Sequence, residues 1–313
     1  MKPTVKLAAL LGAVVVAGSV SVWLYLQLGR QREIGAATPQ PRRAEVSPPA
    51  IPLANAKPAL APAAVQTIVA VANTNSYADR VKAIRVLPAE LPAEVIQAFF
   101  TYLFAPSPAS TENREPENWL RNVLMDKLAE SPALPAGLVG MLVAIYQDPA
   151  QDIVMRDYAV QHLTPVYAQA SAEEKVAVQQ TLWAAVAETD SSIAGTALLA
   201  LRDLGEAHPE FEPTKLGAAA LKLAEDDRSG ELSRITAVQL CGRMGIHQVA
   251  PILRQLAQTS DNIPLQIAAI AALGDVGDAA ERDYLRQLAN QPEPRLRLAL
   301  ETALKKLNRR LGI

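Results

Sequence analysis

Cysteine and histidine are scarce in this sequence of 313 residues, which has one cysteine and three histidines. A single cysteine, Cys241, cannot form an internal disulfide or supply a zinc site with several thiolates. The histidines, His162, His208 and His247, lie far apart, and no two of them have a short ligand spacing. The sequence therefore predicts no metal site and no cofactor.

Motifs of catalysis are also absent from the sequence. We find no glycine-rich phosphate loop, no nucleophile elbow and no metal-binding helix motif. Residues 65–292 carry 17 basic and 28 acidic side chains, so the main part of the chain lacks the basic footprint of a nucleic-acid-binding protein. We therefore expect neither an enzyme nor a nucleic-acid-binding protein.

Aromatic residues make up 4% of the chain although half of it is apolar, so alanine and leucine supply most of the apolar surface. The sequence shows no sustained alternation of apolar and polar residues, which a half-buried strand would require. Small alanine side chains allow helices to approach closely. This composition predicts an all-α fold of stacked helices.

The first 30 residues resemble a membrane anchor. An uncharged, mostly apolar run extends from residue 7 to residue 28, which is long enough to cross a bilayer as a helix. Lys2, Lys6 and Arg30 flank this run, and Trp23 and Tyr25 lie near its far end, where amphipathic rings favour the interface. We expect a single-pass segment in the inner (cytoplasmic) membrane, with the remainder of the chain on the periplasmic side. The alternative is a signal peptide whose cleavage leaves a secreted or periplasmic protein.

Residues 31–64 are expected to form a disordered tether. Seven prolines and ten alanines fall within residues 36–64, with no aromatic residue among them. Proline lacks a backbone donor and disfavours helix, so this segment reads as an extended spacer. A solenoid over residues 65–313, clearest over 151–308, follows it.

The remaining sequence repeats every 31–41 residues, which is the length of one helix–turn–helix unit. In each copy, a small or apolar residue precedes a larger or softer apolar residue by four positions, so both lie on one helix face. Seven segments align: 80–87, 121–128, 156–163, 194–201, 234–241, 266–273 and 297–304. About seven helix pairs are expected, with Gly205, Gly245 and Gly277 ending three of the first helices in a left-handed conformation. The prolines, including Pro116, are expected between helices or at helix starts.

The clearest copy, residues 268–280 followed by 284–289, resembles a HEAT repeat of the short type found in phycobilisome-lyase-like proteins. Residues 237–245 with 252–257 form a second copy. The resemblance implies an α-solenoid whose second helices line its concave face. It implies no activity, because such solenoids serve many functions.

The two copies share the segment Leu-Arg-Gln-Leu-Ala, 32 residues apart on successive second helices. Its polar residues are Arg254, Gln255, Arg286 and Gln287. If the repeats stack in register, these side chains form a short ladder, and arginine suits the recognition of carboxylates. The alternative is a solvated surface, or pairing with local acids such as Glu281 and Asp283.

Other polar residues fit structural roles better. Asp278 resembles the residue that caps the second helix, and Cys241 aligns with leucines at core positions. The sequence thus favours a membrane-tethered scaffold that binds a protein of unknown identity. Two alternatives stay open: a lyase-like or chaperone-like factor for a chromophore protein or nascent partner, and a structural subunit of an envelope complex.

Overall fold

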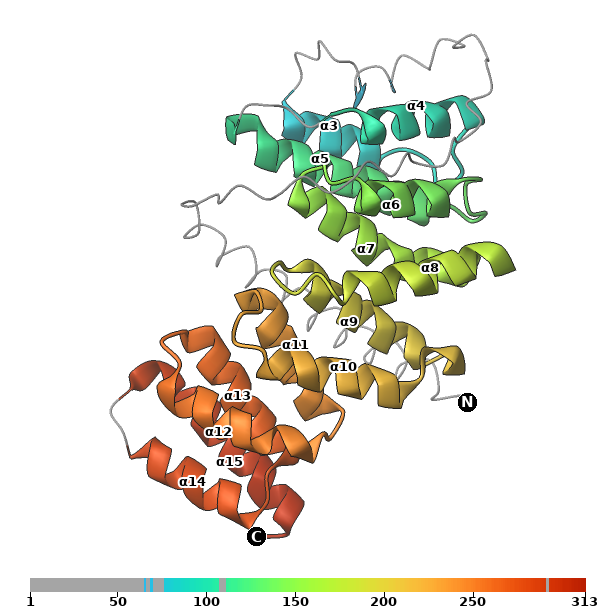
Figure 1. Ribbon diagram of the computed structural model, residues 1–313. Coiled ribbons are helices and arrows are strands. Elements are labelled where there is room, and N and C mark those ends of the chain that lie inside the picture. The colour runs from blue at the N-terminus through green and yellow to red at the C-terminus, as the bar shows by residue number, and fades with distance from the viewer. Residues whose placement is uncertain (1–64, 66–67, 70–75, 107–110, 291–292) are drawn as a thin grey trace, which may run out of the picture. The chain divides into compact units, whose positions relative to one another are not determined.

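The computed structural model describes residues 65, 68–69, 76–106, 111–290 and 293–313. These residues form thirteen α-helices, labelled α3 to α15, with no strand among them (Figure 1). The helices are α3 (Tyr77–Arg85), α4 (Ala93–Phe104), α5 (Thr111–Ala129), α6 (Leu138–Gln147), α7 (Ile153–Tyr167), α8 (Ala172–Ala185), α9 (Ile193–Gly205), α10 (Pro213–Glu225), α11 (Glu231–Arg243), α12 (Ala250–Thr259), α13 (Ile263–Val276), α14 (Ala279–Ala289) and α15 (Arg297–Leu311). The all-α prediction is confirmed for this part of the chain.

The predicted anchor and tether lie outside the described residues. Among the helices that are described, none is both long and apolar enough to cross a bilayer. The predicted flanking residues of the anchor also lie outside: Lys2, Lys6, Trp23, Tyr25 and Arg30. The membrane segment and the periplasmic location therefore stay predictions.

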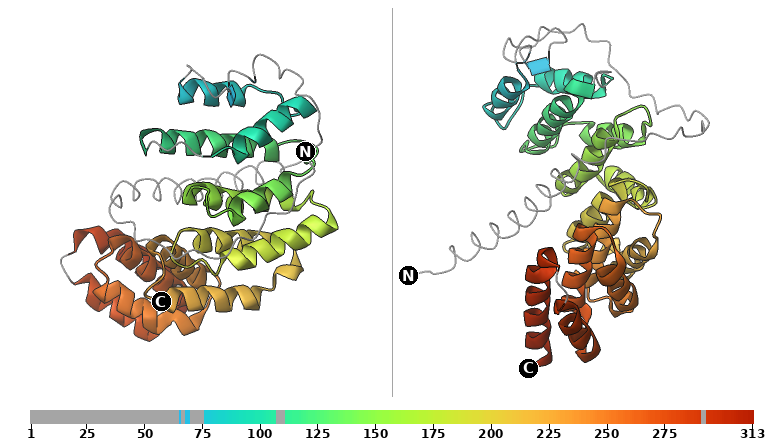
Figure 2. Two further views of the ribbon diagram at one scale, coloured as in Figure 1. Left: turned by 45° about the horizontal axis from the view of Figure 1, so that its top comes forward. Right: turned by 90° about the vertical axis from the view of Figure 1, so that its left-hand side faces the viewer.

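The helices form a repeated two-layer arrangement (Figure 2). Each first helix packs along the next first helix, in the order α3, α5, α7, α9, α11, α13 and α15. Each second helix packs against the first helix of the following repeat, from α4 on α5 to α14 on α15. In the described part of the chain, six helix pairs and the single helix α15 thus take the place of the approximately seven pairs expected.

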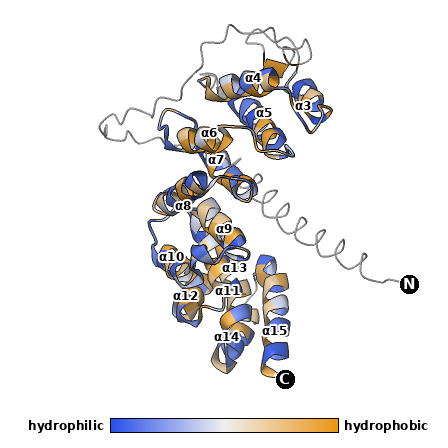
Figure 3. Cartoon of the chain, turned by 90° about the vertical axis from the view of Figure 1, so that its right-hand side faces the viewer, coloured by the Kyte–Doolittle hydropathy of each residue, from blue (hydrophilic) through white to orange (hydrophobic). Residues whose placement is uncertain are grey.

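The apolar residues that defined the repeats form the core. Ala159, Ala197, Ala237 and Ala269 are fully buried, as are the residues four positions after each of them, including Cys241. Coloured by hydropathy, the helices carry apolar and polar residues on different sides (Figure 3). A repeat cannot bury such a side alone, so the stacking of neighbours produces one continuous core.

Small residues let successive first helices approach very closely. A Cβ atom placed on Gly242 of α11 would lie 2.9 Å from the Cα atom of Ala272 on α13. One repeat later, a Cβ on Gly274 would lie 2.9 Å from the Cα atom of Ala303 on α15. Real Cβ contacts are essentially never this short, so these two equivalent glycines set the spacing between the helices.

In four of the seven aligned segments, the first residue is polar and donates to a carbonyl at the end of the second helix of the preceding repeat. Arg156 donates to the carbonyl of Tyr146 at 2.7 Å, Arg234 to that of Ala224 at 3.0 Å, and Gln266 to that of Ala257 at 3.4 Å. Arg121 does the same with the carbonyl of Ala105 at 2.8 Å, just after α4. The last carbonyls of a helix have no partner inside it, so these side chains supply the missing donors.

The turn predictions are partly wrong. Gly245 ends α11 with a φ of 69°, as expected, but Gly277 follows α13 in extended backbone with a φ of −65°, and Gly205 is the last residue of α9. Gly277 is required by space instead, because an added Cβ would lie 2.5 Å from the carbonyl oxygen of Leu273. Pro116 lies inside α5 and not before it, within the second turn, where only one helical hydrogen bond is lost.

The predicted cap of α14 is confirmed. Asp278 accepts hydrogen bonds from the backbone N–H groups of Ala280 and Glu281, and Glu281 accepts one from the N–H of Asp278. This reciprocal arrangement is a capping box, which satisfies donors that the first turn leaves open.

Candidate protein-binding surface

The two Leu-Arg-Gln-Leu-Ala segments occupy equivalent places on α12 and α14. Their leucines are buried in the core, and their arginines and glutamines are exposed. The polar side chains of both repeats therefore lie on the surface, as the sequence predicts: Arg254, Gln255, Arg286 and Gln287.

The side chain and backbone carbonyl of Arg254 are both occupied by contacts with the next repeat. Its guanidinium pairs with the carboxylate of Glu281, a side chain that is 6% exposed. The phenolic hydroxyl of Tyr284 donates to the backbone carbonyl of Arg254 at 2.9 Å. Since a buried carboxylate is costly without a partner, Arg254 stabilises the start of α14. For Arg254 the structure therefore shows the alternative that the sequence left open, which is pairing with the nearby acid Glu281.

Arg286 is available to a partner. Its Nη1 atom lies 3.6 Å from a carboxylate oxygen of Asp283, and both side chains are more than half exposed. An ion pair of this kind contributes little, because water and salt screen it. Arg286, Gln287 and Gln255 thus form the accessible part of the surface, which we name the α12–α14 surface.

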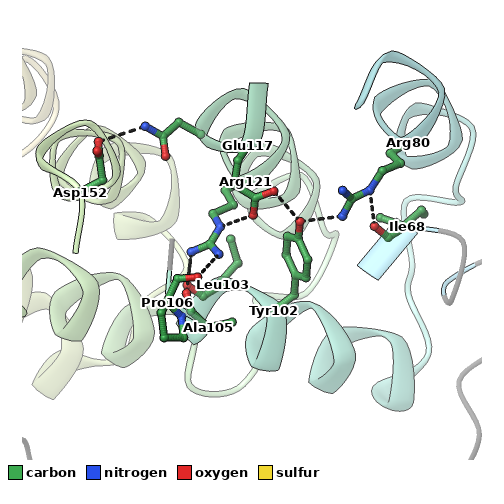
Figure 4. Close-up of polar contacts among 10 residues, drawn as sticks. Ile68, Arg80, Tyr102, Leu103, Ala105, Pro106, Glu117, Arg121 and Asp152 are labelled. Carbon is green, nitrogen blue, oxygen red and sulfur yellow. Dashed lines mark hydrogen bonds and ion pairs between the residues drawn. The ribbon is translucent and has the colours of Figure 1, made fainter. Parts of the chain in front are cut away.

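A second set of polar residues lies buried between the first repeats (Figure 4). The hydroxyl of Tyr102 accepts a hydrogen bond from Arg80 at 2.6 Å and donates one to Glu117 at 2.8 Å. The Nε atom of Arg121 donates to the other oxygen of Glu117 at 2.7 Å. Arg121 also donates to backbone carbonyls at the end of α4, those of Leu103, Ala105 and Pro106.

This buried network is structural. The Nε atom of Arg80 donates to the carbonyl of Ile68 at 2.7 Å, and Arg121 donates to Glu117 and to backbone carbonyls as described. Burial, with the nearby Glu117 carboxylate, raises the pKa of Tyr102, so its hydroxyl stays protonated and holds both hydrogen bonds. The network joins α3, α4 and α5.

Comparison with known proteins supports the repeat assignment. Residues 217–305, from α10 to α15, match the family model of HEAT repeats. Residues 217–305 contain HEAT repeats. A solved structure of human deoxyhypusine hydroxylase in complex with glycerol is 18% identical, covering 79% of this chain and 95% of that chain, with a TM-score of 0.36. This likeness is too low to carry an argument, and no curated protein matches.

His162 has partners that sequence spacing does not reveal. The Nε2 atom of His162 lies 3.0 Å from a carboxylate oxygen of Asp126, and its Nδ1 atom lies 2.8 Å from the carbonyl oxygen of Tyr158. Asp126 lies 36 residues earlier, about one repeat, so the pair bridges α5 and α7. Within the described residues, no group of three potential ligands could hold a metal ion.

Cys241, within the HEAT repeats of residues 217–305, lies in the core, and burial raises the pKa of its thiol to about 12. Only the thiolate is nucleophilic, so we expect the native protein to react with a thiol reagent at pH 8 at least about a hundredfold more slowly than an exposed cysteine. Timed labelling with and without denaturant, followed by mass spectrometry, measures this. The unfolded chain should take up one label rapidly. Rapid labelling of the native chain would contradict the burial of Cys241.

Proposed function

We propose that this protein is a membrane-tethered scaffold that binds a partner protein through the α12–α14 surface. HEAT repeats commonly mediate protein–protein interactions. The observation that supports this site is the recurrence of an exposed Arg-Gln pair over the same buried leucines on successive second helices. Repetition at one spacing suits a partner segment that extends across two repeats.

The chemistry of the surface favours an acidic or amide-rich segment of the partner. Arg286 offers a planar donor group with only a weak local acid, and a guanidinium can bind a carboxylate with two parallel hydrogen bonds. Gln255 and Gln287 each offer both a donor and an acceptor. Arg254 acts here as a positioning residue, because its own guanidinium holds Glu281.

A photo-cross-linking experiment in native membranes tests this proposal. A photoreactive residue replaces Gln255 or Gln287 in the full chain, and Ala271, exposed on the first helix α13, serves as the control position. We expect one defined protein to be captured from the two glutamine positions and not from Ala271. The mass of the adduct and its peptides identifies the partner.

The charge of Arg286 provides the matched variant. Arg286→Glu should abolish the capture, whereas Arg243→Glu, the same change at an exposed site on α11, should leave it intact. Arg254→Glu is unsuitable, because it would place an acid beside Glu281 and disturb the cap of α14. Capture that survives Arg286→Glu would move the binding site elsewhere, and no capture from any position would sink the scaffold proposal.

Placement at the membrane is part of the proposal. The apolar run over residues 7–28 would insert the chain in the inner membrane, with the HEAT repeats on the periplasmic side. Protease added to intact spheroplasts should then degrade the repeats. Full protection would place the repeats in the cytoplasm.

A further inference from the structure

Helix α15 carries a charged outer face at the positions where earlier first helices receive a neighbour. Lys305 follows the aligned segment 297–304, as Gly242 and Gly274 follow theirs. The two glycines allow the next first helix to come within contact of the backbone. An exposed lysine at the third position prevents such an approach, so this face of α15 remains open to another kind of partner.

Two of the cations of α15 are used within the fold. Lys306 pairs with Asp275, and Arg310 donates to the carbonyls of Gly274, Asp275 and Gly277 at the end of α13. These contacts neutralise the negative end of the α13 helix dipole. They leave a separate group of cations on the outer face.

This group consists of Arg297, Lys305 and Arg309, which are exposed and pair with no described residue. They are spaced by eight and four residues, so they follow one side of the helix. Leu298, which is 75% exposed, lies at the same end as Arg297. We name these four residues the α15 face. Glu301, the one exposed acid on the helix, lies on the same side, four residues from both Arg297 and Lys305, so the face carries three cations and one acid.

We propose that the α15 face docks on the surface of an anionic lipid bilayer, an inference that rests on the proposed membrane tether. The evidence is charge complementarity: residues 293–313 carry six basic and two acidic side chains, whereas residues 65–292 carry 17 and 28. Anionic headgroups attract the basic segment 293–313 and repel the acidic segment 65–292. Each cation near such a surface raises binding by about fivefold, and tethering multiplies the effect of weak contacts.

A bilayer suits the α15 face better than a protein segment does. Protein interfaces depend on several apolar anchors that enter pockets, and Leu298 is the one large exposed apolar side chain on α15. A headgroup layer requires no shape complementarity, only cations and a side chain that can enter the acyl boundary.

Fluorescence of the full chain in vesicles tests the proposal. Leu298→Cys carries an environment-sensitive dye, and the buried Cys241 stays unlabelled. A second variant, Thr214→Cys on α10, carries the same dye as the reference position. The vesicles contain phosphatidylcholine alone or an equal mixture of phosphatidylcholine and phosphatidylglycerol. We expect a blue shift at position 298 only in the mixed vesicles, reversed by high salt, and none at position 214.

Charge variants provide the control. Lys305→Glu/Arg309→Glu should remove the shift, whereas Lys222→Glu/Arg228→Glu, with the same change in net charge at exposed sites elsewhere, should not. Equal emission in both vesicle types, or a shift that survives Lys305→Glu/Arg309→Glu, would overturn the proposal. A blue shift at position 298 that appears with polyglutamate but not with mixed vesicles would indicate that the partner of the α15 face is an acidic protein and not a lipid bilayer.

The anchor is tested separately by flotation. A chain that inserts through residues 7–28 floats with both vesicle types. If the chain does not float with vesicles of phosphatidylcholine alone, the membrane anchor of the proposed function is contradicted. In that case, flotation with the mixed vesicles, lost in Lys305→Glu/Arg309→Glu, still supports the α15 face.

Discussion

Replacing Arg121 with alanine is expected to lower the free energy of unfolding of the first repeats by about 3–5 kcal/mol. The change leaves the carboxylate of Glu117 without its ion pair in a site where both side chains are almost fully buried. It also removes the donors that cap the carbonyls at the end of α4. Hydrogen exchange of the full chain in detergent, read on peptides from α3 to α5, measures the loss locally.

Two further variants test whether loss of the buried Arg121–Glu117 ion pair causes the destabilisation of Arg121→Ala. Arg121→Met/Glu117→Gln removes both charges and should be more stable than Arg121→Ala, since no unpaired carboxylate remains. Arg202→Ala breaks an exposed pair with Asp203 and should cost no more than about 1 kcal/mol. If Arg121→Ala cost as little as Arg202→Ala, the network of Figure 4 would not be what holds α3, α4 and α5 together.

The sequence predicted the helices and their core because both depend on local spacing. An apolar pair four residues apart fixes a helix face whatever that face contacts, and the repetition of Ala237/Cys241 at Ala269/Leu273 indicates like neighbours. The cap of α14 was also predictable, since Asp278 and Glu281 lie three residues apart. Each of these features is contained within one helix or one turn.

Contacts between repeats were not predictable in the same way. His162 meets Asp126 only because the stacking brings them together. The pairing of Arg254 with Glu281 was one of the alternatives that the sequence left open, and the stacking of α12 and α14 decides it. The recurrent arginine that begins several aligned segments was visible, but its partner is a backbone carbonyl, which carries no sequence signal. The conformation of Gly277 also depends on space, here the carbonyl of Leu273, and not on the left-handed backbone that glycine commonly indicates.

A methyl group at either close-contact glycine should separate two repeats. We expect Gly242→Ala and Gly274→Ala each to destabilise the chain by about 1–3 kcal/mol, the usual cost of overpacking. At both sites the atom that the new Cβ would meet is the backbone of the next first helix, which cannot move aside as a flexible side chain does. Thermal unfolding of the full chain in detergent, followed by circular dichroism, measures the loss.

Gly140 of α6 provides the matched control, because a Cβ added there would meet no atom within 4 Å. Gly140 is exposed within the helix, so Gly140→Ala should raise stability by up to about 1 kcal/mol through helix propensity alone. The same substitution is thus expected to have opposite signs at positions 140 and 274. An equal gain at both positions would show that α13 and α15 do not pack as closely as described.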